Sequence, residues 1–202
     1  AADALLDRAP GSVAIRADLA DAAAVEGAVA RAADSLDGID VFLHAAAHAD
    51  AGDAAKLAQV DADAFDRTMA INVRSAFLAV RALAPHFAAA QRGDIVFVGS
   101  IDSVKPAPSP PHYVASKAAL RGLAMTFAKD LGPRNVRVNV VAPGLLDGGI
   151  AQLVPDGLRR EYLKHCALKR LGRFAEVAEL CAFLALENTY ITGQTLAVDG
   201  AL

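Results

Sequence analysis

Residues 94–117 read DIVFVGSIDSVKPAPSPPHYVASK, and this stretch decides the fold class of the chain. It begins with four apolar residues, 95–98, a run that suits a strand and is too short for a helix. Because consecutive positions are apolar, we expect a strand buried on both faces, as in a parallel sheet covered by helices. Beyond a turn rich in proline and serine, the chain has helical spacing from Pro110 onward.

The same alternation of short strands and longer helices extends in both directions. The predicted strands are residues 13–17, 39–43, 94–99, 136–141 and 195–198. The predicted helices are residues 21–35, 64–90, 110–131 and 175–186, with a shorter polar helix near 156–166. We therefore expect a doubly wound α/β fold, with three Rossmann-like α/β/α layers around a parallel sheet. Since the sequence has no repeat, low-complexity linker or change of composition, residues 1–202 are expected to form one domain.

Composition narrows the class of partner. The 202 residues are 54% hydrophobic, and basic and acidic residues are mixed to a formal net charge of -3. This balance argues against nucleic acid or an anionic membrane and favours a small-molecule substrate, or one linked to a carrier protein. Segment 1–10 lacks the pattern of a secretion signal, and two cysteines make no disulfide framework, so we expect a cytoplasmic protein. The five histidines have no metal-ligand spacing, and no metal is expected.

Three side chains in the opening stretch suggest proton-transfer chemistry. Tyr113 and Lys117 are four residues apart, which places the phenol and the ammonium on one face of a helix. An adjacent cation lowers the pKa of a phenol and brings proton transfer within reach at neutral pH. Ser100 directly follows a strand, at the end of the sheet where open α/β folds bind ligands. A Tyr-x-x-x-Lys pair alone is more often a pair of surface residues without a catalytic role, so this interpretation depends on the surrounding motifs.

Those motifs resemble the short-chain dehydrogenase/reductase family along nearly the whole chain. Tyr113 follows Ser100 by thirteen positions and precedes Lys117 by four, which is the catalytic spacing of the family. Asn72, in the Ile-Asn-Val segment 71–73, matches the fourth catalytic residue. The pattern is most similar to the 3-oxoacyl carrier-protein reductases of fatty acid biosynthesis. Alcohol or sugar dehydrogenases remain an alternative, because these motifs do not separate the branches.

The resemblance implies a role for each residue. Tyr113 would donate the proton in ketone reduction, Ser100 would orient the carbonyl, and Asn72 would help to hold a water for proton relay. Lys117 would bind the nicotinamide ribose and lower the pKa of the tyrosine. The cofactor would be NADP or NAD, with NADP slightly favoured, and it supplies the hydride. The implied cofactor-binding residues are Asp18, Leu19, Ala45, Ala46, Ala47, Tyr113, Lys117, Pro143 and Gly144.

The resemblance also implies a homo-oligomer, a dimer or tetramer. In the family, the two helices predicted at 64–90 and 110–131 pair across a twofold axis. Both segments carry more apolar residues than one sheet-facing stripe requires, and surplus apolar surface usually meets a partner.

The chain departs from the family pattern at three places. The usual Asn-Asn-Ala-Gly is replaced by residues 44–47, His-Ala-Ala-Ala, and Gly148 stands where a threonine commonly contacts the carboxamide. The first two strands of the family and their Gly-rich phosphate loop have no counterpart. In the sheet of the family, these two strands would lie between the strands at 13–17 and 39–43, so the sheet would have a gap without them. We therefore expect them to precede residue 1 in the sequence. We also expect the given segment alone neither to fold nor to bind cofactor.

The excursion at 144–172 is expected to form a mobile lid, with an ordinary surface connection as the alternative. Within it, Cys166 is expected to be inert, and the basic residues Lys169, Arg170 and Arg173 are more simply a solvated face than a carrier-protein site. The altered 44–47 segment keeps a second hypothesis open, a catalytically idle relative that serves as a binding scaffold.

Overall fold

The computed structural model describes residue 9 and residues 11–49, 57–105 and 109–202. Its centre is a sheet of four parallel strands in the order β1-β2-β3-β4. Each strand pairs with the next strand along the chain, so every crossover passes over a face of the sheet. The strands are β1 (Val41–His44), β2 (Gly93–Val98), β3 (Val136–Pro143) and β4 (Thr195–Val198).

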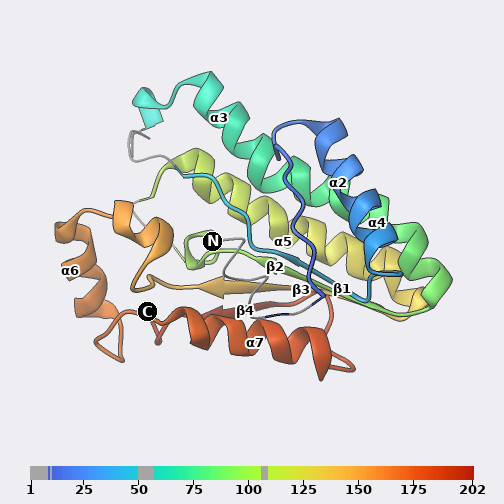
Figure 1. Ribbon diagram of the computed structural model, residues 1–202. Coiled ribbons are helices and arrows are strands. Elements are labelled where there is room, and N and C mark those ends of the chain that lie inside the picture. The colour runs from blue at the N-terminus through green and yellow to red at the C-terminus, as the bar shows by residue number, and fades with distance from the viewer. Residues whose placement is uncertain (1–8, 10, 50–56, 106–108) are drawn as a thin grey trace.

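Helices cover both faces of this sheet, which confirms the predicted Rossmann-like three-layer arrangement (Figure 1). The helices are α2 (Ala22–Ser35), α3 (Ala62–Met69), α4 (Ser75–Ala90), α5 (Pro111–Leu131), α6 (Asp156–His165) and α7 (Phe174–Leu186). On β2, Ile95 and Phe97 pack with α4 and α5, whereas Val96 between them packs with α7. Successive side chains of a strand point to opposite faces. The apolar run of β2 therefore contributes to the hydrophobic core on each face of the sheet.

Residues 13–17 do not form the predicted strand, and that prediction is wrong. The segment has irregular backbone, and Val13 is 51% exposed. In the described part of the chain, the four-stranded sheet does not include this segment, and β1 pairs with β2 alone. Residues that favour strands form one only where a neighbouring strand offers ladder hydrogen bonds.

The helix predicted at 64–90 is interrupted by a π-helical turn. Residues Ala70–Arg74 form this turn between α3 and α4. The wider turn follows from i to i+5 hydrogen bonding, which accommodates one more residue than an α-turn. Asn72 is completely buried within it. The interruption therefore lies at the position that the sequence associates with catalysis.

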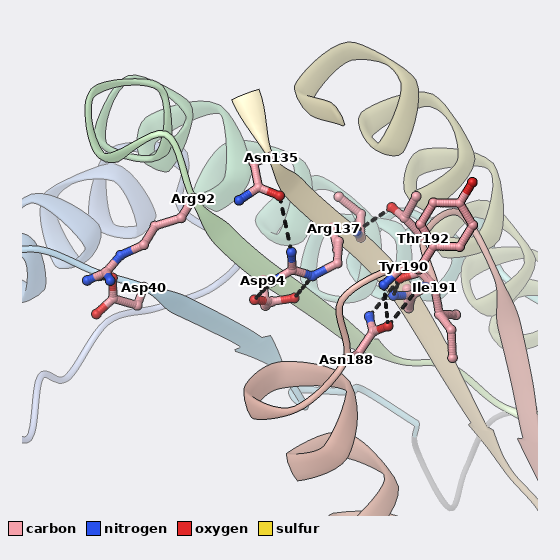
Figure 2. Close-up of polar contacts among 11 residues, drawn as sticks. Asp40, Arg92, Asp94, Asn135, Arg137, Asn188, Tyr190, Ile191 and Thr192 are labelled. Carbon is pink, nitrogen blue, oxygen red and sulfur yellow. Dashed lines mark hydrogen bonds and ion pairs between the residues drawn. The ribbon is translucent and has the colours of Figure 1, made fainter. Parts of the chain in front are cut away.

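At the amino ends of the strands, a buried ion pair joins β2 to β3 (Figure 2). Arg137 donates two hydrogen bonds to Asp94, from Nε to Oδ1 at 2.8 Å and from Nη2 to Oδ2 at 2.6 Å. Burial nevertheless raises the pKa of Asp94, since loss of water outweighs the attraction of the guanidinium. A second pair, Arg92 with Asp40, lies nearby at 2.8 Å but in solvent.

These two ion pairs provide a matched test of stability. We expect Arg137→Leu to lower the free energy of unfolding by about 3 kcal/mol, because it leaves a buried carboxylate without its cation. The control, Arg92→Leu, breaks a pair whose side chains are 67% and 63% exposed. There the loss should stay below about 1 kcal/mol. Equal losses in urea unfolding would contradict the assignment of a structural role to the buried pair.

The connection into β4 is fixed by side chains that satisfy its backbone (Figure 2). The Asn188 side chain donates to the Ile191 carbonyl at 2.7 Å and accepts from the Ile191 amide at 2.8 Å. Thr192 accepts a hydrogen bond from the Val138 amide at 3.0 Å. The loop therefore holds β4 in register with β3.

None of the helices in the described ranges combines the length and apolarity that crossing a bilayer requires.

Candidate active site

Ser100 lies just beyond the carboxyl end of β2, as predicted. It is buried, and its Oγ accepts a hydrogen bond from the Asp102 amide at 3.2 Å at the start of a short 3-10 turn, Ile101–Ser103. Gly99 allows the strand to approach its neighbour closely, because a Cβ there would lie 2.7 Å from Val140 Cγ1. The close approach of the backbone at Gly99 and the hydrogen bond from Asp102 therefore fix the position of the Ser100 hydroxyl.

Tyr113 and Lys117 lie in the first two turns of α5, and the Lys117 Nζ is 5.9 Å from the centroid of the Tyr113 ring. The predicted pairing on one helix face is confirmed. Ser100 acts as a hydrogen-bonding neighbour of the Tyr113 side chain. The geometry brings these three side chains together at the end of β2, although they are separated in the sequence.

The pKa of Tyr113 moves opposite to the expectation. Burial raises it to about 12, and the negative charge of Asp102 adds to this rise, while the hydrogen bond from Ser100 opposes it. The predicted lowering by Lys117 is wrong for this structure. A phenol with such a pKa is protonated at neutral pH, so it can donate a proton without first acquiring one.

Lys117 is buried against the sheet and is only 2% exposed. Its Nζ donates to the Val98 carbonyl at 2.8 Å. Burial lowers the pKa of Lys117 to about 8, because the ammonium has lost most of its hydration. The side chain therefore carries a positive charge at pH 7 and begins to lose it just above.

Asn72 connects the π turn to two other parts of the site. Its Nδ2 donates to Ser116 Oγ at 3.0 Å and to the His48 carbonyl at 3.1 Å, and its Oδ1 accepts from the His48 amide at 2.6 Å. Ser116 in turn donates to the Tyr113 carbonyl at 2.7 Å. The Asn72 side chain is therefore engaged in fixing α5 against the loop after β1.

Five of the other predicted cofactor residues lie where β1 and β3 end, and the remaining two precede α2. Ala45, Ala46 and Ala47 follow β1, and Pro143 ends β3. Gly144 donates from its amide to the Val198 carbonyl at 2.9 Å, and a Cβ there would lie 2.9 Å from Asp199 Cα. Asp18 is exposed and Leu19 packs in the small core between α2 and α4.

The predicted lid segment is closed at its base. Leu146 and Gly172 form a parallel bridge, and the Asp147 amide donates to the Gly172 carbonyl at 2.9 Å. Gly148 also has a structural reason to differ from the family's threonine, since a Cβ there would lie 2.9 Å from the Phe174 ring. The basic residues that follow are partly neutralised, because Arg170 makes two hydrogen bonds to Glu176.

Sequence reasoning missed two contributors to the site. Asp102 shifts the pKa of Tyr113 and accepts a hydrogen bond from Ser109 at 2.7 Å. His44, considered only as a departure from the family pattern, is buried, and this burial, together with the charge of Lys117 on α5, lowers its pKa to about 4. Neither residue forms part of a local pattern with its partners, so only the assembled fold reveals them.

Comparisons with known proteins agree with this arrangement. A family model described as enoyl-(acyl carrier protein) reductase matches residues 1–202. A short-chain dehydrogenase/reductase from Serratia marcescens has a similar structure, with a TM-score of 0.87 and 32% identity over 99% of this chain and 82% of that one. The chain belongs to the short-chain dehydrogenase/reductase family.

Among sequence relatives of this short-chain dehydrogenase/reductase, 2-(R)-hydroxypropyl-CoM dehydrogenase from Xanthobacter autotrophicus is 35% identical over 190 residues, 93% of the chain and 76% of the relative. The 3-oxoacyl-[acyl-carrier-protein] reductase FabG of Thermotoga maritima is 34% identical over 149 residues, 73% of the chain and 61% of that protein. The chain therefore spans about three-fifths to three-quarters of the length of these relatives.

A short-chain dehydrogenase from Burkholderia cenocepacia, solved in complex with NADP, has a TM-score of 0.78 and 33% identity over 92% of this chain and 74% of that one. The family comprises oxidoreductases that use NAD or NADP. The predicted family is thus confirmed, and the branch within it is a separate question.

Proposed function

We propose that this short-chain dehydrogenase/reductase reduces a ketone to a secondary alcohol with a nicotinamide cofactor, and that its substrate is a 3-oxoacyl thioester. The observation that carries the proposal is the meeting of Ser100 and a neutral Tyr113 at the carboxyl end of β2. Two hydroxyls on rigid elements can hold one carbonyl oxygen in place. As negative charge develops on that oxygen, Tyr113 donates its proton and Ser100 stabilises the oxyanion.

Lys117 and Asn72 complete the proposed machinery. Lys117 has N–H groups beyond the one that donates to Val98, and these can bind ribose hydroxyls. Asn72 fixes the start of α5 through Ser116, and we assign its backbone, in the π turn, to the proton relay. In this assignment, Lys117 binds the ribose of the cofactor and Asn72 serves the proton relay.

The carboxyl edge of the sheet fits a nicotinamide cofactor, which would supply the hydride. The loop 45–47 carries only methyl side chains, so its backbone is accessible to a flat ligand. Asp18 offers an exposed carboxylate just before α2. We assign cofactor contacts to Asp18, Leu19, Ala45, Ala46, Ala47, Tyr113, Lys117, Pro143 and Gly144, and favour NADP over NAD because a related structure holds NADP.

The thioester substrate is the finer part of the proposal. FabG of Thermotoga maritima supports it, whereas the 2-(R)-hydroxypropyl-CoM dehydrogenase supports an alcohol dehydrogenase of another substrate class. Segment 144–172, proposed as the lid, would form much of the substrate pocket.

The test is NADPH oxidation by the full-length protein with acetoacetyl-CoA, with a cyclic ketone and a sugar ketone as comparison substrates. We expect the highest kcat/KM with the thioester. Preference for the other ketones would shift the proposal to the alcohol or sugar branch. Saturable quenching of cofactor fluorescence without any turnover would favour an idle scaffold.

We also propose a homo-oligomer, either dimer or tetramer, formed through α4 and α5. Phe77 and Met125, on the outer faces of these helices, are 38% and 60% exposed. Light scattering at micromolar concentration should give a mass of two or four chains, and Met125→Glu should shift the population towards the monomer. A monomeric parent protein would contradict the proposal.

A further inference from the structure

Residues 100–105, which we call the serine turn, are held by basic side chains from two directions. On the side of α5, Arg121 Nη1 donates to the Ser103 carbonyl at 2.6 Å. On the side of β4, the Lys105 ammonium donates to Asp199 Oδ2 at 2.8 Å. Lys105 and Asp199 are 94 positions apart in the sequence, so this ion pair joins the end of the serine turn to the residue that directly follows β4.

The main chain of Lys105 is bonded back to the start of the serine turn. Its amide donates to the Ile101 carbonyl at 2.9 Å, and the Val104 amide donates to the same oxygen at 2.8 Å. The Ser103 hydroxyl and amide both donate to the Ser100 carbonyl, at 2.7 Å and 3.1 Å. A single hydrogen bond therefore connects Lys105 to the residue next to Ser100.

Asp199 is suited to hold a cation. Its side chain is only 10% exposed, and its Oδ1 accepts a hydrogen bond from the Ala201 amide at 3.0 Å, which leaves Oδ2 for Lys105. Burial alone would raise the pKa of Asp199, but the hydrogen bonds from Lys105 and Ala201 hold this pKa below its usual value. The same ammonium also donates to the main-chain oxygen of Leu202. Two acceptors, one of them ionised, therefore hold the end of the serine turn.

The main chain around Asp199 is itself anchored. Tyr162 on α6 donates its hydroxyl to the Asp199 carbonyl at 3.0 Å. The Leu168 amide, in the segment after α6, donates to the Gly200 carbonyl at 3.2 Å. Hydrogen bonds to a neighbouring helix and to the loop after it thus fix the residue to which Lys105 is bound.

We propose that Lys105 is a positioning residue for Ser100, and that it acts by anchoring the serine turn on Asp199. The inference rests on the role of Ser100 in the proposed function. A hydroxyl that stabilises an oxyanion must already be placed at the reacting oxygen, and a displacement of about 1 Å can cost about 100-fold in rate. Lys105 acts through Ser100 in this assignment and does not itself contact the reacting atoms.

A double-mutant cycle on the full-length protein separates this positioning role from a general structural one. Lys105→Met removes the ammonium and keeps most of the side-chain length, and Lys105→Arg restores a cation. Ser100→Ala removes the hydroxyl on which Lys105 is inferred to act. The matched control is Arg92→Met, which breaks another cation–carboxylate pair of 2.8 Å, at the amino ends of the strands. Each variant would be assayed with NADPH and acetoacetyl-CoA.

We expect Lys105→Met to lower kcat about 10-fold and to leave the Kd of the cofactor unchanged, and Lys105→Arg to recover most of the loss. In the Ser100→Ala background, Lys105→Met should change kcat by less than about twofold, because the group that it positions is gone. An equal loss in the two backgrounds, or a comparable loss in Arg92→Met, would overturn the proposal.

Hydrogen exchange measured by mass spectrometry provides a readout that needs no turnover. The amides of Ser103, Val104 and Lys105 all donate within the serine turn. Their exchange should be about 10-fold faster in Lys105→Met and near the parent rate in Lys105→Arg, while exchange in β2 stays unchanged. Unchanged exchange of the serine turn in Lys105→Met would contradict the anchoring. A parent protein that reduced no ketone would instead count against the proposed function, and the exchange rates would still decide whether Lys105 anchors the turn.

Discussion

The Tyr113→Phe variant is expected to lose about 10²- to 10⁴-fold in kcat for ketone reduction, the range attributed to one general acid. The substitution removes a single hydroxyl from a ring that otherwise keeps its packing, so the variant should fold and bind cofactor as the parent does. Steady-state kinetics and the Kd from cofactor fluorescence test the two halves of this expectation.

Tyr190→Phe is the matched control, because Tyr190 is 94% exposed beside Asn188 at the amino edge of the sheet. It makes the same chemical change far from Ser100 and should leave kcat unaltered. A Tyr113→Phe enzyme as fast as its parent would remove the tyrosine from the mechanism and leave the family resemblance without its chemistry.

Lys117→Met should weaken cofactor binding by about 10- to 100-fold, the loss expected for hydrogen bonds from a charged donor. Methionine keeps much of the buried volume of the side chain, so the effect reports on the ammonium more than on packing. The rate should fall as well, because Lys117 is assigned to hold the cofactor that supplies the hydride.

The lowered pKa of Lys117 gives this prediction a pH dependence. The charged form is the one present at low pH, so cofactor affinity should decline as pH rises through about 8. Lys117→Met should bind weakly at every pH and lose that dependence. An unchanged Kd, measured by titration from pH 6 to pH 10, would exclude the ammonium from cofactor binding.

Local patterns predicted most of the fold. The sequence placed α5 and α7 to within one residue at their first positions, because apolar periodicity and a proline at the start are local properties. The strand at 13–17 was wrong because strand formation also needs a neighbour. The π turn was missed because the surrounding residues continue to favour helix on both sides.

The features of the candidate site also fall into those that the sequence predicted and those that it did not. The grouping of Ser100, Tyr113 and Lys117 followed from their places at the end of one strand and on one helix, taken together with the family resemblance. The direction of the Tyr113 pKa did not, because it depends on burial and on Asp102, which no spacing reveals. The hydrogen bond between His44 and Ser75 likewise joins residues that lie 31 positions apart in the sequence.

The π turn between α3 and α4 has a consequence for how the sequence can evolve. It accommodates one more residue than an α-turn, so α3 and α4 keep their relative orientation only while this segment keeps its length. Removing one residue from this segment would rotate α4 by about 100° relative to α3 and carry Asn72 away from His48 and Ser116. Natural variants should therefore change the side chains of residues 70–74 more readily than their number.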